Sequence, residues 1–204
     1  GRKQAGAFGM YETLDELRQE ALQCKNCGLH AGRHNVVFGT GRPDAKIMLI
    51  GEGPGENEDL QGEPFVGRSG QLMDKMLEYA GFSRKTNVYI ANMVKCRPPQ
   101  NRDPLNVEMD ACIGYLRNQV ALIRPKIIVC LGRVAAIRLI REDFKITKEH
   151  GLWFEKAGTW MMAMYHPSAL LRDPRKRPEA FEDLKTLQAK IREVCTHTYG
   201  QNVL

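Results

Sequence analysis

Four short apolar runs, separated by segments with the apolar spacing of helices, dominate this chain of 204 residues. They occupy residues 46–50, 87–94, 126–132 and 160–165. Each run is too short for a helix and is flanked by turn residues, which is typical of a strand buried on both faces. Consecutive strands joined through helices lie parallel in one sheet, with the helices packed on its faces. The sequence therefore predicts an α/β fold, a three-layer α/β/α sandwich with a central, largely parallel four-stranded sheet.

The helix boundaries are predicted from capping residues. Ser69 is a good N-cap for a helix that Gly81 should end, because glycine tolerates the left-handed conformation that follows a helix. Asp103 and Pro104 are expected to open the next long helix. A final amphipathic helix is expected from about residue 178 to residue 194.

Composition limits the class of protein. A hydrophobic fraction of 43% and a charged fraction of 26% are ordinary for a soluble globular chain, and no apolar run approaches the length of a membrane span. We expect a flexible N-terminus over residues 1–10, a single domain over residues 11–204 and a cytoplasmic location, because the first residues lack the apolar core of a secretory signal. The net charge of +6 favours an anionic partner such as nucleic acid.

Polar residues follow three of the four predicted strands. Glu52 follows the first strand, Asn92 ends the second, and His166 follows the fourth. The carboxyl ends of parallel strands meet at one edge of a sheet, where α/β proteins bind their ligands. Because folding does not require polar residues at all three positions, we expect them to form a site.

The loop after the first strand begins Gly51-Glu52-Gly53-Pro54-Gly55 and is strongly acidic. It is unsuited to phosphate, because its acids precede the first cation, Arg68, and Pro54 has no N–H to donate. It suits an electropositive transition state or a neutral ring. Phe65, near its end, is either a core residue or a platform for a flat ring, and an ordinary turn with solvated acids remains the alternative for the loop itself.

Four cysteines are candidate metal ligands: Cys24, Cys27, Cys96 and Cys112. Four thiolates suit tetrahedral zinc or an iron–sulfur cluster, and the long gap between the second and third is unlike a compact zinc ribbon. The alternative for Cys112 is a helix core residue. Cys130 and Cys195 are interpreted as a core residue and a spare thiol.

Taken together, these motifs resemble those of family 4 uracil-DNA glycosylases, the iron–sulfur branch of the uracil-DNA glycosylase superfamily. The resemblance covers nearly the whole chain and rests on Gly51-Glu52-Gly53-Pro54-Gly55, Glu58-Asp59, Pro64-Phe65-Val66-Gly67, Asn92, Lys95-Cys96-Arg97-Pro98-Pro99 and His166-Pro167-Ser168. It implies a structural 4Fe–4S cluster on the four cysteines named above. It also implies a monomeric DNA repair enzyme that acts on uracil-containing DNA, double- or single-stranded, without a nucleotide cofactor or a lyase step.

The resemblance also implies roles for individual residues. Glu52 and His166 are the expected catalytic pair: Glu52 acts near the sugar, where positive charge develops, as electrostatic stabiliser, water-positioner or base, and His166 donates to uracil O2 as the base departs. The substrate-binding residues are expected to be Gly53, Glu58, Phe65 and Asn92. Phe65 would stack on the flipped base, the Asn92 amide would pair with its O4 and N3–H, and Glu58 would crowd the C5 position and so exclude thymine.

The segment after His166 resembles a DNA wedge loop. Its expected DNA-binding residues are Ser168, Leu170, Leu171 and Arg172. Leu170 or Leu171 would fill the gap left by the flipped base, and the arginines after them would grip phosphate.

Two other functions account for parts of the sequence. One is a non-enzymatic nucleic-acid-binding module with a structural four-cysteine site. The other is a nucleotide hydrolase with an acidic, magnesium-binding loop. The convergence of Glu52, Asn92 and His166 favours the glycosylase.

Overall fold

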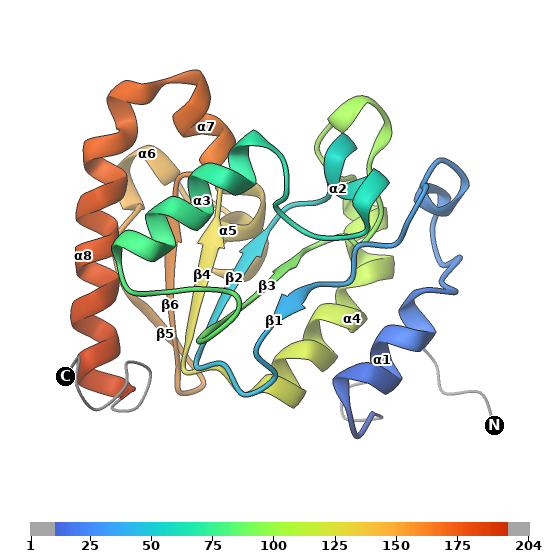
Figure 1. Cartoon of the computed structure of the whole chain (residues 1–204), viewed down its shortest axis with the longest axis horizontal. Coiled ribbons are helices and arrows are strands. Elements are labelled where there is room, and N and C mark those ends of the chain that lie inside the picture. Colours follow the sequence, from blue (N-terminus) through green and yellow to red (C-terminus); the bar gives the residue numbers. More distant parts are fainter. Residues whose placement is uncertain (1–10, 196–204) are drawn as a thin grey trace.

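A six-stranded sheet forms the middle of the molecule (Figure 1). The computed structural model describes residues 11–195, so the flexible N-terminus predicted for residues 1–10 lies outside the described residues. The strands are β1 (Thr40–Gly41), β2 (Ile47–Gly51), β3 (Val88–Asn92), β4 (Ile127–Leu131), β5 (Phe154–Lys156) and β6 (Thr159–Met164), in the order β1-β3-β2-β4-β6-β5. The four central strands are parallel, and β1 and β5 pair antiparallel at the two edges.

The predicted number of four strands is wrong because it misses both edge strands. β1 has two residues and β5 has three, too short for a hydrophobic period to be visible. β5 joins β6 through a two-residue turn in which Ala157 and Gly158 have φ of 48° and 83°. Positive φ at both positions is the geometry that matches the twist of a hairpin. The four predicted strands are the central parallel ones, so the α/β sandwich is confirmed.

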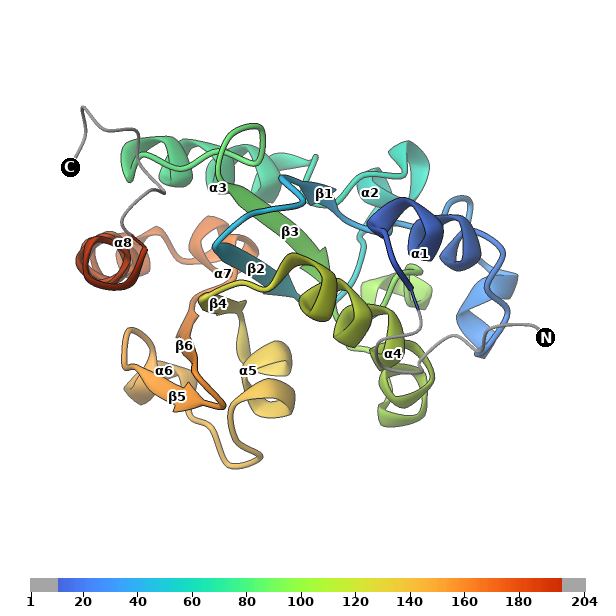
Figure 2. The same cartoon turned by 90° about the horizontal axis from the view of Figure 1, so that it is seen from below.

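Helices cover both faces of the sheet (Figure 2). On one face the core includes residues of α1 (Leu14–Ala21), α4 (Asn106–Ile123) and α5 (Arg133–Leu139). On the other it includes residues of α3 (Arg68–Tyr79), α7 (Pro167–Arg172) and α8 (Arg177–Val194). The remaining helical segments are α2 (Glu56–Gln61), α6 (Ile146–Glu149), η1 (Gly28–Ala31), η2 (Pro99–Asn101) and η3 (Pro174–Lys176). None of the described helices is long and apolar enough to span a membrane.

The central strands are buried because alternate residues serve the two layers. In β2, Ile47 and Leu49 pack with the α3 and α8 layer, whereas Met48 and Ile50 pack with the α1 and α4 layer. A strand with helices on both faces therefore needs a continuous apolar run, which is the pattern that revealed it in the sequence.

Two predicted helix starts are displaced. Gly67, and not Ser69, is the N-cap of α3. The N-cap of α4 is Leu105, and its N–H donates to Glu108 at 2.8 Å, so Asp103 stays in the preceding loop. The predicted end of α3 at Gly81, where φ is 84°, and the final helix α8 are confirmed.

Candidate active site

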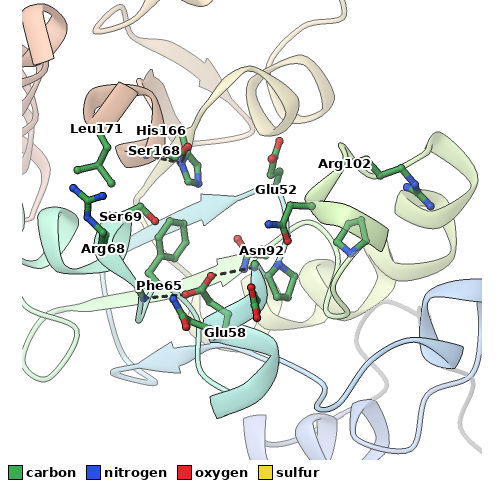
Figure 3. Close-up of a pocket in the computed structure, with 18 of the residues that line it drawn as sticks. Glu52, Glu58, Phe65, Arg68, Ser69, Asn92, Arg102, His166, Ser168 and Leu171 are labelled. Carbon is green, nitrogen blue, oxygen red and sulfur yellow. Dashed lines mark hydrogen bonds between the residues drawn. The ribbon is translucent and has the colours of Figure 1, made fainter. Parts of the chain in front are cut away.

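The three strand ends bring Glu52, Asn92 and His166 to one pocket of about 490 Å³ (Figure 3). Gly51 pairs with Asn92 in the register of β2 and β3, so Glu52 emerges beside the end of β3. His166 follows β6 and reaches the same edge of the sheet. In the strand order, β6 is two strands from β2, on the side opposite to β3. The convergence predicted from the polar strand ends is therefore present.

Asn92 is 2% exposed, and its Oδ1 atom is buried without a hydrogen-bond partner. A buried acceptor with no partner destabilises the ligand-free protein. A ligand that donates a hydrogen bond to this acceptor removes that energetic cost. Gly51 makes the room for this arrangement, because a Cβ there would lie 2.6 Å from Asn92 Oδ1 and 2.7 Å from Phe65 Cζ. The pocket therefore presents an acceptor beside an aromatic ring.

The backbone holds Phe65 in place through a strained conformation. Its φ is 54°, which is uncommon for an aromatic residue. Arg84 donates to the carbonyl oxygens of Pro64 and Phe65 at 2.6 and 2.8 Å, and a Cβ at Gly70 would lie 2.0 Å from Phe65 O. Phe65 packs in the core and also lines the pocket, with its ring centroid 5.4 Å from that of His166, and its role as a platform for a flat ring stays a prediction.

Glu58 lines the pocket and closes the acidic loop on itself. Its carboxylate accepts from the backbone N–H groups of Gly55, Val66 and Gly67 at 3.0, 3.0 and 3.1 Å. A carboxylate with three such donors is held firmly. The sequence did not show this bracing role, although Glu58 three residues after Gly55 is the spacing of a helix-capping glutamate. The proposed contact with C5 stays a prediction.

His166 is held in one neutral tautomer. Its Nδ1 lies 3.1 Å from the Ser168 N–H, which donates to it, and 2.7 Å from Ser168 Oγ. Since Nδ1 accepts, the ring proton is on Nε2. Burial lowers the pKa of His166 to about 4, and the positive charge of Arg172 contributes to the shift. The residue therefore offers a neutral N–H donor at physiological pH.

Glu52 lies where charges of both signs meet. Burial raises its pKa, and a neighbouring carboxyl, that of Asp103, raises it further, whereas Arg133 and Arg172 oppose the shift. Gly53 lines the pocket beside it, and a Cβ at Gly53 would lie 2.8 Å from Val94 Cγ2. The backbone can therefore pass close to the neighbouring loop only because residue 53 has no side chain.

The structure separates the two leucines of the predicted wedge. Leu170 is fully buried in the core of the α8 layer, so it cannot enter DNA. Leu171 lines the pocket, as do Ser168 and Arg172. The helical geometry of α7 is the reason, because consecutive side chains of a helix are rotated by about 100° around its axis, so one can pack inward while the next faces the pocket.

The four candidate cysteines line a second, small cavity between the N-terminal segment and the sheet. Cys24 and Cys27 come from the segment after α1, Cys96 from the loop after β3, and Cys112 from α4. All four are free of disulfides, and burial raises the pKa of Cys112 to about 12. Four thiols that converge from three parts of the chain fit a bound metal ion or iron–sulfur cluster in number and chemistry. Over residues 11–195, no three His, Cys, Asp or Glu side chains stand in a formed metal geometry.

Comparison with known proteins agrees with this arrangement. The model of the uracil DNA glycosylase superfamily matches residues 38–186. Type-4 uracil-DNA glycosylases from Archaeoglobus fulgidus and Thermotoga maritima are 43% and 39% identical to the chain, over 90% and 89% of it and over 94% and 96% of their own lengths. The relative from Sulfurisphaera tokodaii is 42% identical over 90% of this chain and 86% of its own. The chain belongs to the type-4 uracil-DNA glycosylases. It is therefore an enzyme of the uracil-DNA glycosylase class.

This type-4 glycosylase has a buried lysine that sequence reasoning missed. The Lys95 ammonium donates to the Asn92 carbonyl at 2.9 Å and to Gln119 Oε1 at 2.7 Å, and burial lowers its pKa to about 8. It holds the end of β3 from behind the pocket. The signal was its place in Lys95-Cys96, directly after the strand.

A second missed residue, Asp59, joins the acidic loop of the glycosylase to the cysteine segment. It is fully buried and accepts from the His34 N–H at 2.8 Å and from His34 Nδ1 at 2.6 Å. Asn35 adds a donation to the Asp59 carbonyl at 2.8 Å. Burial raises the pKa of Asp59, but the hydrogen bonds from His34 and Asn35 outweigh it and leave the pKa below its usual value. The acidic loop is thus attached to the segment that carries Cys24 and Cys27.

Proposed function

We propose that this enzyme hydrolyses the N-glycosidic bond of deoxyuridine in DNA, releases free uracil, leaves an abasic site and has no lyase step. The observation that carries the proposal is the unpartnered, buried Asn92 Oδ1 beside the Phe65 ring. Uracil has an N3–H donor next to its O4 acceptor, so one amide at Asn92 satisfies both. An aromatic platform and a neutral His166 donor in the same pocket support a flat, neutral base as the ligand.

The target nucleotide must leave the stack before it can reach a pocket at the sheet edge. In the flipped position, the uracil ring lies against Phe65, with O4 and N3–H at the Asn92 amide. Glu58 keeps the loop around the ring closed through its three backbone hydrogen bonds. Both single- and double-stranded DNA are proposed substrates. The free-energy cost of unstacking the target base is smaller for the single strand.

Cleavage breaks the bond between C1′ and N1, and the bonding electrons leave with uracil. His166 Nε2–H donates to O2, where negative charge collects. Glu52 faces the sugar, stabilises its developing positive charge, and positions the water whose oxygen bonds to C1′. The proton of that water passes to Glu52 or to the departing uracil, and the sugar keeps the hydroxyl.

The rim of the pocket supports binding to DNA. Leu171 is placed to fill the space of the extruded base, and Arg172 beside it to pair with a phosphate. The net charge of +6 suits the same partner. We also propose that the enzyme acts as a cytoplasmic monomer without a nucleotide cofactor.

A 4Fe–4S cluster on Cys24, Cys27, Cys96 and Cys112 completes the proposal. Bound there, it would supply a structural link between the N-terminal segment, the loop after β3 and α4, and no step of the reaction is assigned to it.

The test is incubation of the protein with an end-labelled oligonucleotide that contains one uracil, in the presence of a chelator. Free uracil and a strand break that appears only after alkali are expected, with no product from a thymine oligonucleotide or from Glu52→Gln. Binding without uracil release would favour the nucleic-acid-binding module, and activity only with magnesium would favour the nucleotide hydrolase. A strand break before alkali would overturn the absence of a lyase step.

A further inference from the structure

An ion pair from two other elements lines a cavity together with Glu52. Asp103 lies in the loop between η2 and α4, and Arg133 is the first residue of α5. Arg133 Nη2 donates to Asp103 Oδ2 at 2.5 Å. The volume of this third cavity is about 360 Å³, and it shares Glu52 and His166 with the candidate active-site pocket.

Glu52 and Asp103 line this cavity together; burial raises the pKa of Glu52, and the negative charge of Asp103 raises it further. A negative charge beside Glu52 disfavours its ionised form and so favours the protonated carboxyl. The positive groups that face Glu52 are Arg133 from α5 and Arg172 from α7, while His166 is neutral. One acid and two cations from three different elements therefore act on a single carboxyl.

The loop that carries Asp103 is held rigidly. Arg102 donates to the Asp103 carbonyl at 3.1 Å and binds the buried Glu108 carboxylate through two hydrogen bonds of 2.8 and 2.9 Å. Gln100 and Asn101 just before it have φ of 55° and 56°. Strained residues of this kind persist where the surrounding structure fixes them, often beside active sites.

Stability does not explain the ion pair. The Asp103 and Arg133 side chains are 47% and 60% exposed, and ion pairs this exposed add little to the free energy of unfolding. A pair that stabilises little, and that is nevertheless held against a catalytic carboxyl by an anchored loop, points to a role in the charge of that carboxyl.

We propose that Asp103 and Arg133 are positioning residues that set the proton occupancy of Glu52, Asp103 favouring the protonated carboxyl and Arg133 the ionised carboxylate. The inference rests on the proposed function, in which Glu52 must be ionised to face the positive sugar. It assigns opposite effects to two residues that form one ion pair. A structural role for the pair would give its two halves the same effect.

The experiment measures single-turnover uracil release from a single-stranded oligonucleotide across the acidic pH range. The midpoint compared is the pH on the acidic side of the pH–rate profile at which the rate is half its maximum. In Asp103→Asn the neighbouring negative charge is gone and Arg133 remains, so this midpoint should fall by about one pH unit. In Arg133→Gln the positive neighbour is gone, so the midpoint should rise by about one pH unit. The double variant should return close to the parent midpoint, and Asp103→Glu and Arg133→Lys should keep it.

The exposed pair Arg42 and Asp44 provides matched controls. Arg42→Gln and Asp44→Asn change the net charge in the same way far from the pocket, and should leave the midpoint unchanged. Midpoints are compared in place of rates, so weaker DNA binding by Arg133→Gln does not affect the result. Thermal melts of each variant show that it is folded.

A second readout avoids catalysis. The side-chain carboxyl carbon of Glu52 is labelled with ¹³C, and its NMR resonance is assigned as the one missing from the spectrum of Glu52→Gln. The midpoint of the pH titration of this resonance should be lower in Asp103→Asn and higher in Arg133→Gln than in the parent. Unchanged midpoints, or shifts in the same direction, in a parent enzyme that releases uracil would overturn the inference and leave the proposed function standing. A parent enzyme that releases no uracil while its Glu52 resonance shifts as expected would overturn the function alone.

Discussion

At the scale of single residues, the pocket depends on groups whose hydrogen-bonding character is fixed before a ligand arrives. Ser168 makes Nδ1 of His166 an acceptor, so the other ring nitrogen is the donor. Lys95 holds the carbonyl of Asn92, while the side-chain oxygen of that residue has no partner. A donor and an acceptor held in advance recognise a ligand without the cost of reorganisation at the moment of binding.

Asn92→Asp should therefore lose most uracil excision. Ionised aspartate has only acceptors, so uracil O4 would face a carboxylate oxygen, at a cost of roughly 3 kcal/mol or about 100-fold in rate. Residual activity should shift toward cytosine, whose N4 is a donor. Single-turnover rates on uracil and cytosine oligonucleotides measure both effects.

Asn106→Asp, an exposed change at the start of α4, is the matched control and should leave both rates unchanged. If Asn92→Asp removes uracil at nearly the parent rate, Asn92 does not read the base.

At the scale of elements, α7 divides its work between two neighbouring leucines. Leu170 packs inward and Leu171 lines the pocket, so one helix both anchors itself in the core and presents an apolar side chain to the pocket. In α2, two neighbouring acidic residues likewise have different partners. Glu58 binds backbone N–H groups of its own loop, and Asp59 binds the segment after η1.

Leu171→Ala should slow uracil removal from duplex more than from single strands, because only the duplex requires the stack to be held open. Leu170→Ala should instead lower the free energy of unfolding by about 2–5 kcal/mol, through the cavity it leaves in the core. Paired rate measurements and urea unfolding of both variants separate the two roles. Equal losses on both substrates for Leu171→Ala would mean that it is not a wedge.

Asp59→Asn should destabilise the protein at neutral pH by about 2 kcal/mol, because the donors of His34 lose a charged acceptor inside the protein. The pKa of Asp59 is lowered in the folded state, so its contribution is present above the ordinary aspartate pKa and is lost as pH falls through the folded value. The difference between parent and variant should therefore shrink below about pH 4. Urea unfolding at several pH values measures it, and a difference that grows with acid would contradict the role of Asp59.

At the scale of the whole molecule, the N-terminal segment is attached to the sheet at two places. One is the contact of Asp59 with His34, and the other is the cavity where the four cysteines meet. Arg33 strengthens the second place, since it donates to the Cys24 carbonyl at 2.5 Å and lies 3.6 Å from Cys96 Sγ. A group bound by the four thiols would join segments distant in sequence, which stabilises the folded state most.

Anaerobically prepared protein should be yellow-brown and contain iron. Cys96→Ser should lower the iron content, the stability and the solubility before it changes the preference for uracil, because the proposed cluster would be a structural link. Cys130→Ala, which alters a thiol buried in β4, should keep the iron. Metal analysis and thermal melts test this, and zinc without iron in the parent would refute the cluster.

The sequence by itself determined the four central strands, their parallel direction with helical connections, and the polar residues at their ends. Strands buried on both faces need continuous apolar runs. The polar residues Glu52, Asn92 and His166 stand at or near the ends of those runs and can be recognised there. Such information is local, and so it can be read one segment at a time. The same is true of the cysteine pair and of the glycines at the end of β2.

Only the tertiary structure decided which partner each side chain meets. The two edge strands have too few residues for a period, and Leu170 and Leu171 differ only in the side of α7 on which they lie. Asp103 and Glu52 are far apart in the chain but line one cavity, and the sequence around neither residue predicts this. Charge regulation in this pocket depends on distances across the fold, and such distances are set by packing and not by the local sequence.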